Sequence, residues 1–329
     1  TEKARQRLVR DSVQSLMAEL ELRQPMQGQV LRLRFLNDQS VAACAQQFNV
    51  AEQTIYKAQA KGIEWVADRL EEREQVVRAQ HQRNVRLRIE APSNATLCGV
   101  DAHLVKLVKL LSDEEPLCLI ALEGTGGIGK TALAHVLMEH MIGLSRYEDF
   151  AWVTARHTRL DLGGNLRHQH QPALTSEALV DRLVAQLSEP ESNLTSLVFE
   201  RKLGWLHERL KQAPHFIVVD NLETVLDLET LLPVLQQLAS PSRFLLTSRI
   251  GLGNDPNLYH FQVPLLHEQD ALQLLRNEAQ LRHFPELLQA SDVMLRPIFE
   301  TVGGNPLALR LVAGLLASDT IDNVLGDLH

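Results

Sequence analysis

The sequence predicts an α/β fold built on a parallel sheet, with an all-helical domain before it and a small helical subdomain after it. Between residues 116 and 264, short apolar runs alternate with segments of helical periodicity, as in parallel strands joined by crossover helices. Outside that region only helical periodicity is found. The segment 85–95 interrupts the helical pattern and contains Pro92, which favours a boundary there. The expected divisions are a helical domain at 1–90, a linker at 91–115, an α/β domain at 116–264 and a helical subdomain at 265–329.

The composition is typical of a globular protein that does not enter a membrane. Of the 329 residues, 45% are hydrophobic and 22% are charged, and no apolar run approaches the roughly 18 residues that a membrane helix needs. Cys44, Cys98 and Cys118 are odd in number and widely spaced, so neither a disulfide framework nor a zinc pattern is predicted. These features favour a reducing cytoplasm and no membrane partner.

Charge is divided unevenly along the chain. The net charge is −8, but residues 1–90 carry 15 Lys and Arg against 12 Asp and Glu, which makes them net +3. The remainder of the chain is therefore net −11. A mildly basic N-terminal part on an acidic body indicates separate partners for the two parts.

Residues 40–66, SVAACAQQFNVAEQTIYKAQAKGIEWV, have the pattern of two helices joined by a tight turn. Ser40 is a helix-capping residue, and Asn49 stands where the turn needs a positive φ angle. The positions expected to be buried between the helices are Cys44, Ala45, Phe48, Val50, Ile55 and Ala58. Together with the preceding QVLRLRFLND, the segment resembles the helix-turn-helix of sigma-factor region 4 and of the LuxR proteins.

The second helix of this segment admits two interpretations. In the first, it enters the groove of duplex DNA, with Lys57 and Lys61, one turn apart, on the phosphate backbone. The exposed residues that would read the groove are Glu52, Gln53, Thr54, Tyr56 and Lys57. In the second, the domain is a three-helix adaptor that binds protein. An acid near the start of the helix and a charge of only +3 favour the second interpretation.

The apolar run PLCLIALE, residues 116–123, leads into a glycine-rich loop. The stretch LEGTGGIGKTALA overlaps this run and contains the spacing G-x-x-x-x-G-K-[ST] of the phosphate-binding loop, at Gly124, Gly129, Lys130 and Thr131. The residues before it suit a buried strand, and TALAHVLMEHM after it has helical spacing. The sequence therefore predicts nucleotide binding at this loop.

Each residue type in the loop has a chemical reason. Backbone N–H groups wrap phosphate oxygens only where side chains are absent and positive φ is allowed, as at Gly126, Gly127 and Gly129. The following helix directs its positive dipole end at the phosphates. We expect Lys130 to face solvent until it binds the β- and γ-phosphates, and the Thr131 hydroxyl to bind Mg²⁺.

Two later strands end in charged residues. HFIVVDNLE, residues 215–223, carries Asp220 at the end of its apolar run, where a carboxylate is costly unless it holds a cation or its water. Asp220 is therefore the expected second partner of Mg²⁺. SRFLLTSR, residues 242–249, ends in Arg249, which lies beside the phosphates if this strand sits between the other two.

The stretch 160–175 contains no apolar run and includes Gly163 and Gly164, so a polar loop is expected there. His168 and His170 lie in this stretch. A lone pair of loop histidines two residues apart is more often solvated than bound to metal, and no metal is assigned to it.

Five elements resemble, in order, those of the NB-ARC branch of the STAND class of P-loop NTPases, the signalling ATPases of apoptosis and of plant and bacterial immunity. They are LCGVD (97–101), GTGGIGKTALA (124–134), FAWVTA (150–155), FIVVDN with FLLTSR (216–221 and 244–249), and GGNPLALRL (303–311). The resemblance covers roughly residues 96–320. It implies an α/β P-loop NTPase of the additional-strand type, followed by a small helical subdomain.

By this resemblance the ligand is ADP or ATP with Mg²⁺. Gly99 and Val100 would lie against the adenine, Pro306 would pack on it, and Arg249 would contact the phosphates. The expected catalytic residues are Lys130, Asp220 and Arg249, and the expected metal ligands are Thr131 and Asp220. The residues expected to touch the nucleotide are Gly99, Val100, Gly124, Thr125, Gly126, Gly127, Ile128, Gly129, Lys130, Thr131, Ala132, Arg249, Pro306 and Leu307.

Three departures from the family's pattern bear on mechanism. Val100-Asp101 stands where Arg-Glu is usual. Asn221 follows Asp220 where a second acid is usual, and because an amide cannot take a proton from water, hydrolysis is expected to be slow. Glu223 is nearby in the sequence, which does not give its geometry. The chain is also expected to stop before the family's winged-helix subdomain and its ADP-sensing histidine.

These observations together predict a cytoplasmic ATPase switched by ADP and ATP, acting in transcription regulation or bacterial defence. Exchange of ADP for ATP would open the core, drive self-association and cluster the N-terminal domains. Two other functions stay open. A plain ATP-hydrolysing enzyme would show fast turnover, and a transcription factor with a structural nucleotide would bind DNA regardless of nucleotide.

Overall fold

The computed structural model describes residues 2–89, 97–112, 117–144, 146–155, 158–160, 166–168, 175–189, 192–224, 228–253, 255–316 and 323–324. Pro92, Gly163, Gly164 and His170, which the sequence singles out, lie outside these residues. The chain divides into two compact units, residues 1–84 and 85–329. The finer divisions at 91–115, 116–264 and 265–329 stay predictions.

The first unit is helical throughout its described residues. Its elements are α1 (Glu2–Arg23), α2 (Pro25–Leu31), the π-helical turn η1 (Arg32–Leu36), α3 (Val41–Phe48) and α4 (Glu52–Arg88), whose last four residues belong to the second unit. One apolar cluster joins α1 to Leu31 and to Val66 of α4. A second cluster joins α2, α3 and the start of α4.

The segment at 40–66 forms a helix, a tight turn and a second helix. Ser40 caps α3 by accepting a hydrogen bond from the N–H of Ala43 at 3.1 Å. Asn49 ends α3 in the left-handed region with φ of 53°. Of the positions expected to be buried, Cys44, Ala45, Ile55 and Ala58 are buried, and Phe48 and Val50 are partly buried.

The second unit is built on a five-stranded parallel sheet in the order β2-β5-β6-β1-β7. The strands are β1 (Leu119–Glu123), β2 (Asp149–Thr154), β5 (His215–Asp220), β6 (Arg243–Ser248) and β7 (Leu258–Gln262). The central strands are buried along their whole length, which explains their unbroken apolar runs. The parallel sheet, with β6 inserted between β1 and β5, confirms the predicted α/β class.

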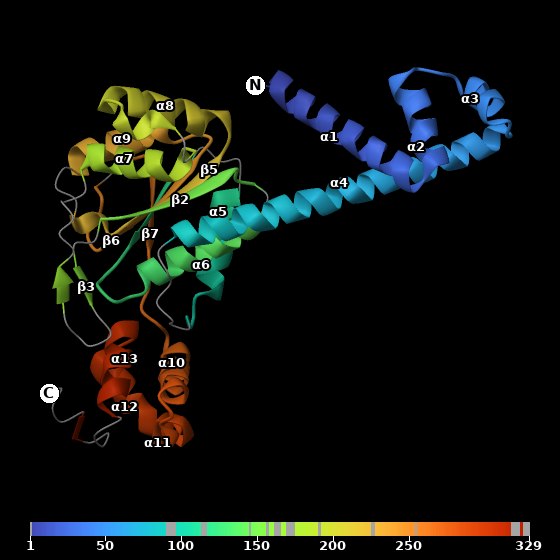
Figure 1. Ribbon diagram of the computed structural model, residues 1–329. Helices are drawn as coiled ribbons and strands as arrows, with labels where there is room; N and C mark the ends of the chain where they lie inside the picture. Colours follow the sequence, from blue (N-terminus) through green and yellow to red (C-terminus); the bar gives the residue numbers. More distant parts are fainter. Residues whose placement is uncertain are drawn as a thin grey trace. The chain divides into compact units, whose positions relative to one another are not determined.

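Helices cover both faces of this sheet (Figure 1). On one face lie α5 (Asp101–Ser112) and α6 (Lys130–Gly143), and on the other lie α7 (Ser176–Leu187), α8 (Phe199–Gln212) and α9 (Leu228–Leu238). Each face has its own apolar core, and in each core alternate residues of the strands meet the apolar side of the helices. The two cores hold the sheet rigid, so the loops at the carboxyl ends of the strands are fixed relative to one another.

One expectation for the second unit is wrong. Residues 160–175 were expected to form a loop, but β3 (Thr158–Leu160) and β4 (Leu166–His168) pair as a short antiparallel ribbon. The ribbon carries His168, and two strands of three residues are too short to produce an apolar alternation that the sequence reveals.

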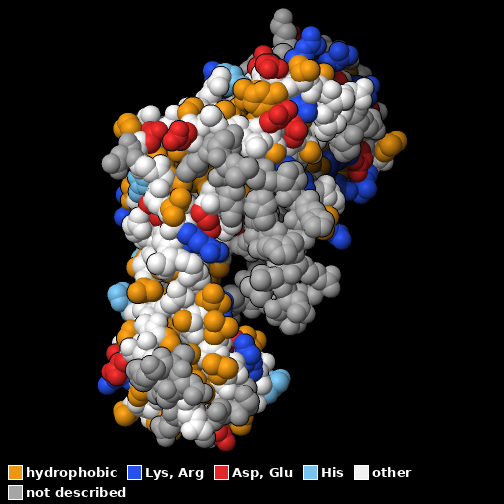
Figure 2. Space-filling model, turned by 90° about the vertical axis from the view of Figure 1, so that its left-hand side faces the viewer, with side chains coloured by type: hydrophobic (Ala, Val, Ile, Leu, Met, Phe, Trp, Pro, Cys, Tyr) orange, Lys and Arg blue, Asp and Glu red, His pale blue; other side chains and the backbone are white. Residues whose placement is uncertain are grey.

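A four-helix subdomain follows the sheet in the described residues. It comprises α10 (Glu268–Leu281), α11 (Pro285–Gln289), α12 (Asp292–Val302) and α13 (Pro306–Leu315), which share one apolar cluster. Hydrophobic side chains gather on the surface of these helices, in the lower part of Figure 2. The exposed apolar residues of α12 and α13 are Val293, Met294, Leu307, Leu311 and Leu315.

In the part of the chain that is described, no helix is both long enough and apolar enough to cross a membrane.

Candidate nucleotide-binding site

The phosphate-binding loop connects the buried strand β1 to α6 at the carboxyl edge of the sheet. Gly127 and Gly129 adopt positive φ angles of 78° and 103°, which other residues rarely tolerate. Gly127 also has no room for a side chain, because a Cβ there would lie 2.5 Å from the Cβ of Leu307. The helix α6 begins at Lys130, directly after the loop, so its N-terminal dipole end faces the space that the loop encloses.

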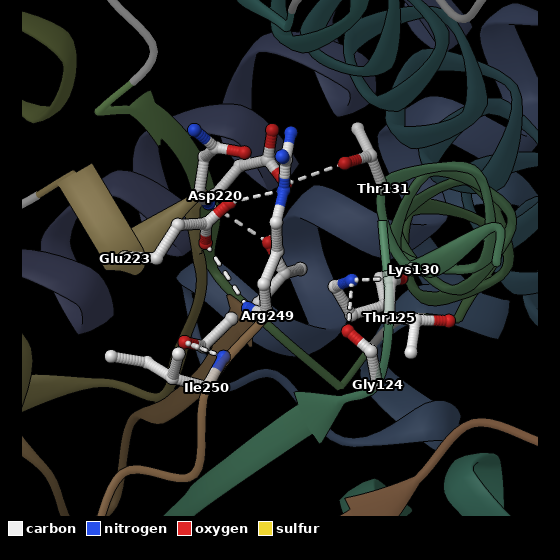
Figure 3. A network of polar contacts seen from close by, with 11 residues as sticks. Gly124, Thr125, Lys130, Thr131, Asp220, Glu223, Arg249 and Ile250 are labelled. Atoms are coloured by element: carbon white, nitrogen blue, oxygen red, sulfur yellow. Dashed lines mark hydrogen bonds and ion pairs between the residues drawn. The ribbon is translucent and has the colours of Figure 1, made fainter. Parts of the chain in front are cut away.

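Lys130 does not face solvent, contrary to expectation. It is 8% exposed, and its Nζ donates hydrogen bonds to the carbonyl oxygens of Gly124 at 2.7 Å and Thr125 at 2.9 Å (Figure 3). Burial is the main reason that the pKa of Lys130 is lowered, and the positive charge of Arg249 lowers it further. The amine therefore folds back on its own loop and donates to two loop carbonyls. In the predicted complex, phosphate oxygens take the place of these carbonyls as acceptors.

Asp220, the last residue of β5, lies at the centre of a hydroxyl network. Its carboxylate is fully buried, and Oδ1 accepts hydrogen bonds from the hydroxyls of Thr131 at 2.8 Å and Thr247 at 2.6 Å. Thr131 and Asp220, the two expected Mg²⁺ partners, thus touch each other. Hydroxyl and carboxylate oxygens are hard ligands of the kind that Mg²⁺ prefers, so the donor set fits the ion. Thr247 was not predicted, although it stands in the quoted strand 242–249.

Arg249 follows β6, which lies between β1 and β5, so the condition for placing it beside the loop is met. A Cβ on Gly126 would lie 3.7 Å from Nη1 of Arg249. The guanidinium Nε lies 2.8 Å from Oε1 of Glu223, and the backbone N–H of Arg249 donates to Oε2 at 3.2 Å (Figure 3). Glu223 therefore has a defined geometry: both of its oxygens are engaged by Arg249.

Asn221 occupies a strained position beside this network. Its φ of 74° lies in the left-handed region, and its backbone N–H donates to the Thr247 hydroxyl at 2.8 Å. Asparagine tolerates that conformation better than most residues. Asn221 also lines the cavity beside the phosphate-binding loop.

A cavity of about 320 Å³ extends from the phosphate-binding loop to the helical subdomain. The predicted contact residues that line it are Gly99, Val100, Gly127, Ile128, Gly129, Lys130, Thr131, Ala132, Arg249, Pro306 and Leu307. Gly124, Thr125 and Gly126 lie in the same loop but do not line it. The structure thus brings residues from 99 to 307 together around one space.

The start of α13 contacts the phosphate-binding loop directly. The N–H of Leu307 donates to the carbonyl of Gly127 at 3.3 Å, and Nδ2 of Asn305 donates to the carbonyl of Gly126 at 3.0 Å. Asn305 also caps α13. The contact between loop and subdomain was not predicted, because nothing local in the sequence encodes it.

Other cavity residues were also missed. They include His103 of α5, Asp270 and Leu274 of α10, and Arg310 of α13. Glu123, beside the loop, was missed as well: its buried carboxylate accepts hydrogen bonds from Nδ1 of His260 at 2.8 Å, from Gln262 at 2.6 Å and from the N–H of Leu252 at 3.0 Å. An acid at the end of an apolar strand was the signal that identified Asp220, and Glu123 carries the same signal.

The residues assigned to DNA lie in the first unit, on the surface of α4. Gln53, Thr54, Tyr56, Lys57 and Lys61 are all exposed, as is Glu52. Their exposure leaves them available to a partner, without identifying it.

Comparison with known proteins places the chain among nucleotide-binding proteins. Residues 100–283 match the NB-ARC domain family. "Probable disease resistance RPP8-like protein 2" of Arabidopsis thaliana is 26% identical over 276 residues, which cover 80% of this chain and 28% of that protein. "Disease resistance protein RPH8A" of the same plant is 24% identical over 281 residues, covering 81% and 28%. The chain thus spans less than a third of the length of these relatives.

Two solved structures are similar to parts of this chain. A STAND protein with a tetratricopeptide repeat sensor from Pyrococcus horikoshii has a TM-score of 0.45 and 15% identity, over 72% of this chain and 33% of that chain. Drosophila ORC bound to DNA has a TM-score of 0.48 and 17% identity, over 69% and 63%. The family match is the more decisive finding. It extends over more than half of the residues, and the chain therefore belongs to the NB-ARC family.

Proposed function

We propose that the chain binds ADP or ATP with Mg²⁺ in the cavity between the phosphate-binding loop and the helical subdomain, and uses the nucleotide as a switch. One observation carries the proposal: residues far apart in the sequence converge on a single cavity beside a loop with the phosphate-binding spacing. The NB-ARC family membership supports the choice of ligand.

The phosphate end of the site is assigned to the loop and its neighbours. Lys130 would exchange its two carbonyl acceptors for β- and γ-phosphate oxygens. Thr131 and Asp220 would hold Mg²⁺, and the bound ion neutralises charge on the phosphate oxygens. Arg249 would direct its guanidinium at the terminal phosphate, which its approach to Gly126 supports.

The base end of the site is assigned to the other side of the cavity. The backbone of Gly99 and Val100 would lie along one face of the adenine and Pro306 against the other, with Leu307 closing the space towards the loop. These residues come from both the sheet domain and the helical subdomain. A nucleotide that contacts both shifts the equilibrium between their docked and separated arrangements by its differential affinity for the two.

This coupling supports a switch. ADP would favour the docked arrangement, and exchange to ATP would favour an open one that associates with further copies of the chain. Because Asn221 replaces the usual acid and both oxygens of Glu223 are engaged by Arg249, ATP would be hydrolysed slowly. A plain ATP-hydrolysing enzyme remains the alternative, and its mark is fast turnover.

The test is mass spectrometry of the nucleotide that co-purifies with the chain, together with a phosphate-release assay in excess ATP and Mg²⁺. The proposal expects bound ADP or ATP and turnover well below the ordinary enzyme range of about 1–10³ per second. A chain that neither retains nor rebinds either nucleotide contradicts the proposed ligand. Turnover within that range contradicts the switch and favours the plain enzyme.

For the first unit, we propose a helix-turn-helix output module. The exposed residues of α4 support duplex DNA as partner, whereas Glu52 among them supports a protein partner. A transcription factor with a structural nucleotide would bind DNA equally with and without ADP or ATP. The relatives described above are plant disease resistance proteins, and a bacterial, cytoplasmic setting stays a prediction.

A further inference from the structure

Asn305 makes two separate sets of hydrogen bonds with the two ends of its side-chain amide. Its Oδ1 accepts from the backbone N–H groups of Leu307 at 3.0 Å and Ala308 at 3.3 Å, which caps α13. Its Nδ2 donates to the carbonyl of Gly126 in the phosphate-binding loop at 3.0 Å. Capping needs only an oxygen acceptor, and serine or aspartate supplies one equally well. The contact with Gly126 needs a donor beyond the capping oxygen, and the Nδ2 atom of asparagine provides it.

The turn before α13 holds Asn305 in place. Gly304 lies so close to the preceding segment that a Cβ on it would be 2.1 Å from the carbonyl oxygen of Leu266. The N–H of Leu266 donates to the carbonyl of Gly304 at 2.9 Å. Pro306 fixes φ at the first position of the helix. The side chain of Asn305 therefore moves with the helical subdomain as one body.

Two successive carbonyls of the loop are held from the subdomain. Gly126 is held by Asn305, and Gly127 by the N–H of Leu307 at 3.3 Å. A trans peptide is planar, so its carbonyl and the N–H of the next residue point in opposite directions. Fixing the Gly126 carbonyl against α13 therefore fixes the direction of the Gly127 N–H, away from α13. Fixing the Gly127 carbonyl does the same for the N–H of Ile128.

We propose that Asn305 is a positioning residue that couples the helical subdomain to the phosphate-binding loop. By holding the Gly126–Gly127 peptide it presents the N–H groups of Gly127 and Ile128 to the phosphates before a nucleotide arrives. When the subdomain separates, the loop loses this support and binds phosphate less tightly. The coupling is reciprocal, so bound nucleotide favours the docked subdomain. This inference rests on the proposed nucleotide site. It adds a direct contact within the chain, between the subdomain and the loop, that does not involve the ligand.

Asn305→Ser tests the link in the full chain, because serine keeps a capping acceptor and adds no charge beside the phosphates. It replaces the Nδ2 donor with the single hydroxyl of a shorter side chain. Calorimetry should show ADP affinity reduced about fivefold, the worth of one neutral hydrogen bond, in a variant that still folds. Thr175→Ala is the matched control. Thr175 caps α7 by accepting from the N–H of Ala178 at 3.2 Å, away from the cavity, so this variant should lose stability but keep its ADP affinity.

Amide hydrogen exchange without nucleotide separates this inference from the proposed ligand. In Asn305→Ser and in the isosteric Asn305→Asp, peptides that span residues 120–132 should exchange faster than in the wild type, and they should be unchanged in Thr175→Ala. Unchanged exchange in both Asn305 variants overturns the coupling, as does wild-type ADP affinity in Asn305→Ser. A wild-type chain that binds no ADP overturns the proposed ligand alone, and the exchange measurement still decides the coupling.

Discussion

The carboxylate of Glu223 holds Arg249 through two contacts, one with the guanidinium Nε at 2.8 Å and one with the backbone N–H at 3.2 Å. Arg249 is 60% exposed, whereas Glu223 is only 13% exposed. The guanidinium also lies beside the loop, because a Cβ on Gly126 would be 3.7 Å from Nη1 and 3.8 Å from Nε. The acid thus orients the arginine and also offsets part of its charge.

Glu223→Gln should strengthen ATP binding more than ADP binding. The amide still offers an oxygen to the backbone N–H of Arg249, but it removes a negative charge that competes with the terminal phosphate. Between partly exposed groups such a charge is worth about 1 kcal/mol, so ATP affinity should rise about three- to tenfold. Calorimetry measures both affinities, with Glu229→Gln on the exposed start of α9 as control. Weaker ATP binding in Glu223→Gln would contradict the competing role.

Asn221→Asp should raise the rate of ATP hydrolysis, because it restores a carboxylate where the family has an acid. Asp, like Asn, tolerates the left-handed φ of 74°, so the loop should keep its conformation. The measurement is phosphate release in excess ATP and Mg²⁺, compared with the wild type and with Asn221→Ala. If Asn221→Asp and Asn221→Ala change the rate of ATP hydrolysis equally, the missing acid is not what limits turnover.

His215 should make the stability of the second unit depend on pH. Its side chain is fully buried at the start of β5, and Nδ1 donates to the carbonyl of Ala213 at 2.8 Å. Burial lowers the pKa of His215 below its ordinary value of 6.5, so the unfolded chain takes up a proton more readily than the folded one. The full stability is therefore present above about pH 6.5 and is lost as pH falls through that value towards the folded pKa.

His215→Gln should flatten this dependence. Chemical denaturation between pH 7.5 and 5 gives the free energy of unfolding of each variant, with the exposed His140→Gln as control. An equally steep loss of stability in His215→Gln and in the wild type would show that another group titrates.

If α4 contacts DNA, Lys57→Ala should weaken binding to all duplexes alike and reduce the salt slope by about one unit, because one phosphate contact is lost. Gln53→Ala should instead relax preference at one base pair, by about 1–3 kcal/mol. Fluorescence anisotropy of the full chain with a labelled random duplex, at low and at physiological salt, measures the first effect, and a set of single-base variants measures the second. No binding at either salt would make the first unit a protein-binding adaptor.

Local patterns identified the parts of the site that chemistry ties to short segments. The glycine spacing located the loop, and an acid at a strand end located Asp220. The position of Arg249 beside the loop was predicted only on the condition that its strand lies between the other two. Strand order is a property of the whole sheet and cannot be predicted from one segment. The capping residue Ser40 was also identified, because a cap acts within three residues of the chain.

What the sequence did not reveal depends on contacts between distant segments. Lys130 was expected to be exposed, but its burial results from the fold of the loop around its amine. Thr247 and Glu123 act through partners up to 139 residues away. The docking of Leu307 on Gly127 requires the subdomain to be placed against the loop, which no local propensity specifies. These contacts depend on how distant segments pack against each other, and the pattern of any one segment does not reveal them.

The central claim, that this loop binds nucleotide phosphate through Lys130, is tested most directly by calorimetric titration of ADP and ATP with Mg²⁺ into the wild type and into Lys130→Ala. Removing a buried charge that bonds phosphate should reduce both affinities about 100-fold or more. Without nucleotide the variant should still fold, with a melting temperature that reports the loss of the two hydrogen bonds to the loop. Lys211→Ala on α8, an exposed lysine, should bind as the wild type does. A folded Lys130→Ala chain with wild-type affinity for either nucleotide would contradict the account.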